Sequence, residues 1–145
     1  MERSETPVRE IMTSPVRSVD PETTLREAAR VLSDESIGSL IVGEDPLDGI
    51  ITETDVVRGV AREVDPASTT VAELMSSPVV TMRPTETVFA AGERMGRNQV
   101  KKLPVTEEGR PVGIVTTTDL AHFLPDRRVG TASSPEPEIE EGEFE

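Results

Sequence analysis

The sequence predicts an α/β (α+β) protein with two β-α-β-β-α repeats that pack sheet to sheet about a pseudo-two-fold axis. Three observations predict this fold: the chain matches itself, each copy alternates apolar strands with amphipathic helices in the same order, and aromatic residues are scarce. With three Phe, no Trp and no Tyr, the core must consist of aliphatic side chains, which suit layered strands and helices. A single copy would leave one sheet face bare, so the two copies are expected to share an interior.

The internal match extends over most of the chain. Residues 8–16 align with residues 71–79, which lie 63 positions later. Residues 49–55 align with residues 113–119 at an offset of 64, so one residue is inserted between the two matches, in a predicted turn where an insertion costs little. The match divides the chain into repeat one (1–65), repeat two (66–129) and a tail (130–145), with a linker at 64–70 that ends in a helix cap.

Within each copy the residue types predict the same order of elements. A short strand comes first, at 16–19 and at 79–82, and a helix follows it. Thr24 and Thr87 can cap these helices, because apolar residues recur at helical spacing directly behind each threonine. Two strands joined by a turn and a last helix complete each copy, at 39–42, 50–51 and 54–63 in repeat one and at 103–105, 112–115 and 118–124 in repeat two.

The composition excludes several classes of function. A formal net charge of −13 disfavours nucleic acid and anionic membranes as partners, because both require a basic surface. The chain has no Cys and one His, which excludes disulfides, cysteine nucleophiles and a multi-histidine metal site within one chain. No apolar stretch is long enough to span a bilayer and the N-terminus is polar, so we expect a cytoplasmic protein without a secretory signal.

The charged residues are unevenly distributed. Thirteen Arg stand against two Lys, and a shortage of lysine beside many acidic residues is typical of halophilic archaeal proteins; an ordinary acidic cytosolic protein is the alternative. The segment 130–145 contains six Glu and no basic residue, so we expect it to be a disordered acidic tail. Such a tail serves either to keep the protein soluble or, with Ile139 and Phe144 as anchors, to bind a partner.

The most specific pattern is Gly-x-x-Thr-x-x-Asp, which occurs twice in register where a strand ends and a helix begins. Free backbone N–H groups and the positive end of the helix suit an anion at this junction. The threonine offers a hydroxyl to a phosphate oxygen, and the aspartate can accept two hydrogens from a ribose diol. Alternatively, the threonines are only helix caps and the aspartates only complement the helix dipole. The doubled pattern favours ligand contact; its residues are Gly49, Thr52, Asp55, Gly113, Thr116 and Asp119.

These features together resemble the CBS-domain family, whose tandem repeats form Bateman modules. The resemblance extends over roughly residues 8–124 and rests on both Gly-x-x-Thr-x-x-Asp motifs, both Ser-Pro-Val segments, Leu103-Pro104-Val105, and Val-x-x-Ile-Met and Val-x-x-Leu-Met at 8–12 and 71–75. It implies a stand-alone, non-catalytic sensor that binds AMP, ADP, ATP or S-adenosylmethionine between the repeats, requires no cofactor and signals to an unidentified protein. A structural or protein-interaction module without bound nucleotide is the alternative.

The resemblance also assigns roles to residues. The motif aspartate holds ribose, the motif threonine contacts ribose or phosphate, and the Ser-Pro-Val segment borders the base. Lys101 and Lys102 precede the middle strand of repeat two, so we expect the cleft of Asp119 and Lys102 to prefer AMP, ADP or ATP. The cleft of Asp55 would bind weakly, stay empty or take a less anionic ligand; alternatively, both lysines are solvated on a strand edge. The candidate ligand contacts, with no catalytic or metal-binding residue among them, are Thr13, Ser14, Val16, Gly38, Ser39, Thr52, Asp55, Ser76, Ser77, Val79, Lys101, Lys102, Pro104, Thr116, Thr118 and Asp119.

The last helix of each repeat offers a further surface. Modules of this family usually form flat homodimers through their helices, and apolar residues on these helices are consistent with a homodimer: Val56, Val57 and Val60 in repeat one, and Leu120, Phe123 and Leu124 in repeat two. Arg58 and Arg62, four residues apart on the first of these helices, could reach a phosphate, although a solvated face or an ion pair in the dimer is favoured.

Overall fold

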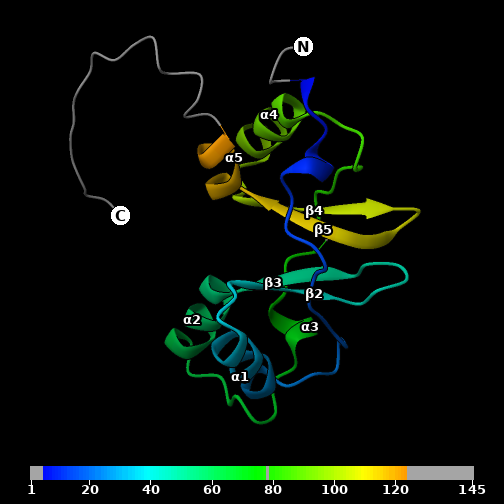
Figure 1. Ribbon diagram of the computed structural model, residues 1–145. Coiled ribbons are helices and arrows are strands. Elements are labelled where there is room, and N and C mark those ends of the chain that lie inside the picture. The colour runs from blue at the N-terminus through cyan, green and yellow to red at the C-terminus, as the bar shows by residue number, and fades with distance from the viewer. Residues whose placement is uncertain (1–4, 78, 124–145) are drawn as a thin grey trace, which may run out of the picture.

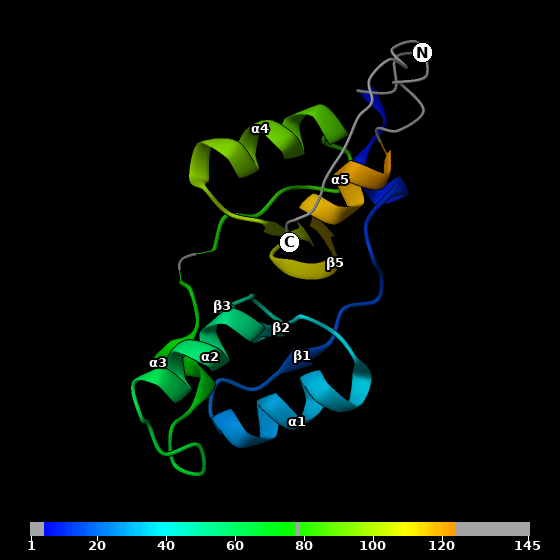
Figure 2. The same ribbon diagram turned by 90° about the vertical axis from the view of Figure 1, so that its left-hand side faces the viewer.

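The protein consists of two α+β halves whose sheets lie against each other in the middle, with helices on the outer sides (Figures 1 and 2). This computed structural model describes residues 5–77 and 79–123. The predicted fold class and the packing of sheet on sheet are confirmed. The tail expected at 130–145 and the helix residue Leu124 lie outside the described residues.

The sheet of repeat one has three strands in the order β1-β2-β3. Strand β1 (Ser18–Val19) runs parallel to β2 (Ser39–Val42), which pairs antiparallel with β3 (Gly49–Thr52). Helices α1 (Leu25–Glu35) and α2 (Glu53–Ala61) cover the outer face of this sheet (Figure 1). The predicted middle strand is confirmed residue for residue, and the other elements lie within a few residues of their expected bounds.

The sheet of repeat two has two described strands, β4 (Lys102–Glu107) and β5 (Arg110–Thr116), which pair antiparallel. Helices α4 (Val88–Asn98) and α5 (Thr117–Phe123) cover its outer face (Figure 1). A short helix, α3 (Val71–Leu74), opens this repeat, and the 3-10 helix Val8–Glu10 is its counterpart in repeat one. Neither of these two leading turns was predicted from the sequence.

The strand predicted at 79–82 is wrong, because only Met82 among these residues pairs, in an isolated parallel bridge. In repeat one the corresponding contact is a ladder, in which the Ile41 N–H donates to the carbonyl of Arg17 at 2.9 Å. Pro104 occupies the position of Ile41 in repeat two and has no N–H to donate. The loss of this bond leaves the described part of the second sheet with two strands.

The two long helices begin at the predicted caps. The Thr24 hydroxyl accepts from the Glu27 N–H at 3.1 Å, and the Thr87 hydroxyl accepts from the Ala90 N–H at 3.0 Å. Each helix ends one residue before a left-handed residue, Ser36 or Gln99. The caps and the apolar stripes behind them therefore give both helices the same start and the same buried face, one helix on each outer side of the molecule.

An ion pair without a counterpart in repeat one fastens the start of α4. Arg94 donates to Glu86 from Nη2 at 2.6 Å and from Nη1 at 3.1 Å, and it also donates to the Thr81 carbonyl at 2.9 Å. The hydrogen bond from Arg94 lowers the pKa of Glu86, and burial opposes this effect. The positions equivalent to Glu86 and Arg94 are Thr23 and Val31, which cannot form such a pair.

The leading turn of each repeat packs into the core of the other repeat. Val8 is fully buried in the cluster formed by α4, β4 and β5, and Val71 is fully buried in the cluster formed by α1, β2 and β3. Their backbones cross as well, since the Val8 N–H donates to the Glu86 carbonyl and the Val71 N–H donates to the Thr23 carbonyl, each at 2.8 Å. The duplicated sequence unit and the packed core are therefore not the same set of residues.

The opposite sheet faces meet through residues that alternate with the two cores. Leu40 and Val42 of β2 face α1, so the intervening Ile41, which is 1% exposed, faces the other sheet. Ile50 in β3 and Pro104 in β4 are also buried outside the two clusters. Both sheets thus bury an apolar face on each side, as the sheet-to-sheet arrangement requires.

Candidate ligand-binding pockets

The Thr and Asp of each Gly-x-x-Thr-x-x-Asp motif form a capping box at the start of α2 and of α5. The Thr52 N–H and hydroxyl both donate to Asp55 Oδ2, at 2.8 and 3.1 Å, and the Asp55 N–H donates to the Thr52 hydroxyl at 3.3 Å. In repeat two the Thr116 N–H donates to Asp119 Oδ2 at 2.9 Å, and the Asp119 N–H donates to the Thr116 hydroxyl at 3.1 Å. These residues are therefore helix caps, as the alternative interpretation held.

The capping boxes leave one oxygen of each carboxylate outside the cap. Asp55 is 7% exposed, and its Oδ1 lies 3.8 Å from a nitrogen of Arg58. Because a carboxylate oxygen has two acceptor positions, Asp55 Oδ1 retains capacity for a ligand hydroxyl. The cap and a ligand contact are thus compatible in the same side chain.

The motif glycines permit the two repeats to cross. A Cβ on Gly49 would lie 2.7 Å from the Ser76 carbonyl oxygen, and a Cβ on Gly113 would overlap the side chain of Met12. At the first crossing Ser76 exchanges backbone hydrogen bonds with Ile50, at 2.9 and 3.2 Å, and at the second Thr13 exchanges them with Ile114, at 2.9 and 3.0 Å. The glycine of the motif therefore serves the close approach of the other repeat's leading segment rather than the ligand.

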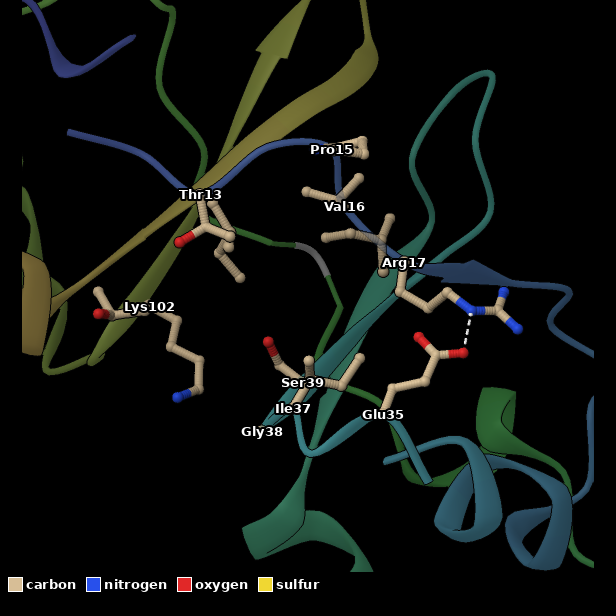
Figure 3. Close-up of a pocket in the computed structure, with 12 residues that line it drawn as sticks. Thr13, Pro15, Val16, Arg17, Glu35, Ile37, Gly38, Ser39 and Lys102 are labelled. Carbon is tan, nitrogen blue, oxygen red and sulfur yellow. Dashed lines mark hydrogen bonds and ion pairs between the residues drawn. The ribbon is translucent and has the colours of Figure 1, made fainter. Parts of the chain in front are cut away.

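Two equivalent pockets of about 380 Å³ each lie between the repeats. The first, which we call the Arg17 pocket, combines the leading segment and β2 of repeat one with the end of β5 (Figure 3). The second, the Asp55 pocket, combines the end of β3 and the start of α2 with segments of repeat two. Each pocket thus takes its helix junction from one repeat and its apolar wall from the other. The Arg17 pocket is lined by Thr13, Pro15, Val16, Arg17, Glu35, Ile37, Gly38, Ser39, Ile41, Lys102, Ile114 and Thr116. The Asp55 pocket is lined by Ile50, Thr52, Thr54, Asp55, Arg58, Ser76, Val79, Val80, Gln99, Val100, Lys101 and Lys102.

Most of the predicted ligand contacts lie in these two pockets. Thr13, Val16, Gly38, Ser39 and Thr116 line the Arg17 pocket, Thr52, Asp55, Ser76, Val79 and Lys101 line the Asp55 pocket, and Lys102 lines both. Ser14 and Ser77 instead line two other hollows, beside the hairpin turns at 43–48 and 107–110. Pro104 is fully buried, and Thr118 and Asp119 lie outside the described lining of both pockets.

The expected placement of the two lysines is wrong for Lys101. Lys101 was expected in the cleft of Asp119, but its side chain lines the pocket of Asp55, and Lys102 lines both pockets. Lys101 stays beside the motif of its own repeat, since its carbonyl accepts from the Thr117 N–H at 3.0 Å, but its side chain lines the pocket of the Asp55 motif across the packed sheets. The Asp55 pocket therefore holds three cationic side chains, those of Arg58, Lys101 and Lys102.

The Arg17 pocket contains two charged residues that the sequence analysis missed. Arg17 Nε donates to Glu35 Oε2 at 3.0 Å, and both side chains are about half exposed, at 46% and 43% (Figure 3). The equivalent residues of repeat two are Val80 and Asn98. Arg17 follows Ser-Pro-Val, and Glu35 is the last residue of α1, three positions after the buried Leu32, so the local sequence does not mark the two residues as partners. Only the fold brings them together.

Among the described residues, no group of three His, Cys, Asp or Glu side chains could hold a metal ion. In the same part of the chain, no helix is both long and apolar enough to cross a bilayer.

The interlocked repeats with two equivalent pockets define a tandem-repeat α+β module. The model of the CBS domain matches residues 8–62 and again residues 71–126, and the chain belongs to the CBS-domain family. CBS domain-containing protein YhcV of Bacillus subtilis (strain 168) is 30% identical over 115 residues, which span 79% of this chain and 82% of that protein. Hypoxic response protein 1 of Mycobacterium tuberculosis (strain ATCC 25618 / H37Rv) is 35% identical over 127 residues, which span 86% and 89%.

Solved structures agree with this assignment. The CBS domain pair of protein MJ0100, in complex with 5′-methylthioadenosine and S-adenosyl-L-methionine, superimposes with a TM-score of 0.76 at 27% identity over 84% of this chain and 98% of that one. Hypoxic Response Protein I with two coordinated zinc ions superimposes with a TM-score of 0.72 at 34% identity over 83% and 100%. The similarity therefore extends over the arrangement of both repeats.

Proposed function

We propose that this protein is a non-catalytic, cytoplasmic sensor that binds adenosine-containing ligands (AMP, ADP, ATP or S-adenosylmethionine) in its two pockets and signals to a partner protein. The observation that carries the proposal is the pair of pockets of about 380 Å³, each of which joins a capped helix start to an apolar wall. Pockets of this size suit a small-molecule ligand, and a few polar groups in them can fix its orientation. The complex of the MJ0100 domain pair with two adenosine derivatives supports the ligand class.

In the Asp55 pocket each part of a nucleotide would find a matching group. Val79, Val80 and Val100 offer apolar surface to the base, and Asp55 Oδ1 can accept from a ribose hydroxyl. The ammonium groups of Lys101 and Lys102 offer point charges to phosphate oxygens. The proposed site thus inverts the expected preference, because the more cationic pocket is the one that contains Asp55.

Isothermal titration calorimetry with AMP, ADP, ATP and S-adenosylmethionine, at low and high KCl concentrations, tests the proposal. We expect Asp55→Asn to weaken ATP binding about tenfold, because a charge-assisted hydrogen bond to ribose is lost while an acceptor for the Thr52 cap remains. Glu27→Gln on the exposed face of α1 is the matched control and should leave the affinity unchanged. The absence of binding by all four compounds would overturn the proposal in favour of a structural or protein-interaction module.

The proposed sensor is a homodimer that pairs through α2. Val57 and Val60 are 65% and 66% exposed on this helix, whereas Val56 packs into the adjoining core. Leu120 and Phe123 of α5 pack against the core of repeat two, so the apolar surface expected on the last helices is concentrated on α2. Sedimentation velocity measures the mass in solution, and a monomer at micromolar concentration would overturn this part of the proposal.

A further inference from the structure

We propose that the Arg17 pocket selects a nucleoside that carries an α-amino acid, whereas the Asp55 pocket selects a nucleoside polyphosphate. This inference rests on the proposed function, because it assigns a ligand class to each of the same two pockets. The two pockets are built from equivalent positions, so the residues that differ between them reveal what each pocket distinguishes. The differences lie in charged side chains.

The ion pair in the Arg17 pocket is complementary to a zwitterion. Arg17 uses Nε for Glu35 Oε2 at 3.0 Å and one terminal nitrogen for the Ser18 carbonyl at 3.1 Å. Within the described part of the chain, Arg17 Nη2 and Glu35 Oε1 have no hydrogen-bond partner. An α-amino acid offers a carboxylate to the first group and an ammonium to the second, and each contact would be a charge-assisted hydrogen bond.

The stability of the fold does not account for this pair. Glu35 is the last residue of α1, where the negative end of the helix disfavours a carboxylate. Both side chains are about half exposed, so their attraction is screened by solvent and contributes little to folding. The pair does hold each partner in position beside the pocket (Figure 3), which lowers the entropy that ligand binding must remove.

The equivalent end of the Asp55 pocket lacks these charges. Val80 occupies the position of Arg17, and Asn98 occupies the position of Glu35. The Asn98 amide donates to the carbonyl of Arg94 at 2.8 Å, so it is directed to its own helix. Lys101, which replaces Gly38 at the equivalent position, adds a cation instead. This pocket therefore favours a ligand with several negative charges and no ammonium group.

Calorimetry with S-adenosylhomocysteine and 5′-methylthioadenosine tests the assignment. Both compounds are adenosine derivatives with a neutral thioether sulfur, and only the first carries an α-amino acid. We expect the wild-type protein to bind S-adenosylhomocysteine at least about tenfold more tightly than 5′-methylthioadenosine, as two added charge-assisted hydrogen bonds imply. In Glu35→Gln and in Arg17→Gln the ratio of the two affinities should fall toward one. ATP binding should be unchanged in both variants.

Asn98→Ala is the matched control, since it alters the equivalent position of the other repeat and should leave the ratio as in the wild type. Equal affinities for the two thioethers, or a ratio that Glu35→Gln leaves intact, would overturn the assignment while ATP binding still supported the proposed function. If neither thioether nor ATP bound, the proposed function and the assignment would both be overturned.

Discussion

The two pockets have the same volume and equivalent walls, yet one is bordered by an ion pair and Lys102 and the other by three cations and Asp55. Residues that hold the repeats together are alike in both copies: the capping threonines, the motif glycines and the leading valines. Residues at the outer ends of the pockets differ, as Arg17 and Val80 do. The two copies have therefore kept the residues that build the fold, whereas the charged residues that line the two pockets have diverged.

The exchange of leading segments makes this comparison less simple than the alignment suggests. Each pocket is formed from both copies, so a substitution in one repeat changes one wall of each pocket. Lys102 shows this most clearly, because it lines both pockets while Lys101 lines one. The sequence position of a substitution therefore does not tell which of the two pockets it alters.

The largest expected effect tests whether the two crossings are equivalent. Gly49→Ala should lower the free energy of unfolding by about 3 kcal/mol, because its Cβ would meet the Ser76 backbone oxygen, which cannot move without breaking a bridge. Gly113→Ala should cost about 1 kcal/mol, since the flexible side chain of Met12 can yield. Gly96→Ala, in open space on α4, is the control and should stabilise by about 1 kcal/mol. Urea denaturation measures all three, and equal losses at the two crossings would contradict this view.

A smaller effect is expected from the ion pair that only repeat two possesses. Glu86→Gln should lower the free energy of unfolding by about 1 kcal/mol at neutral pH, because Arg94 loses a charged partner. The folded-state pKa of Glu86 is lowered, so its stabilisation is complete above its usual pKa of 4.5 and is lost as the pH falls through the lowered value. The difference between wild type and variant should therefore shrink in acid.

Urea denaturation between pH 3 and pH 7 checks this dependence. Glu93→Gln is the matched control, because its contact with Arg97 at 4.0 Å joins two well-exposed side chains and should contribute almost nothing. A loss for Glu86→Gln that stayed constant down to pH 3 would show that its carboxylate is not what stabilises the start of α4.

The smallest expected effect distinguishes the shared lysine from the unshared one. Lys101→Gln should weaken ATP binding about threefold and leave the binding of S-adenosylhomocysteine unchanged. The reason is that Lys101 lines the Asp55 pocket and does not line the Arg17 pocket. Lys102→Gln should weaken both ligands by a similar factor. Calorimetry with each ligand measures the two effects, and identical behaviour of the two variants would contradict the boundary position of Lys102.

Local sequence patterns were sufficient for most of the fold. Thr24 and Thr87 precede apolar stripes of helical period, and both are caps in the structure. The prediction of a strand at 79–82 was wrong because the neighbouring strand β4 contains Pro104, which has no N–H to donate. This loss cannot be foreseen until it is known that the two segments would pair. Short-range patterns therefore predicted elements well and pairings less well.

The pockets were harder to predict because they depend on which copy each segment joins. Val8 is as apolar as any core residue of its own repeat, so nothing local indicates that it packs against α4 of the other. Lys101 accepts a backbone hydrogen bond from Thr117 in the Asp119 motif, yet its side chain lines the pocket of Asp55. Arg17 and Glu35, which are 18 positions apart, meet only in the folded chain.

The crossing of Val8 and Val71 has a consequence for the history of the chain. A single repeat would lack the leading valine that fills its core, and its own leading valine would fit the core of another copy. Two separate repeats could therefore fill each other's cores as a symmetric pair. The present connectivity is that of such a pair joined end to end through residues 64–70. After the join, neither half can be removed without opening a hole in the half that remains.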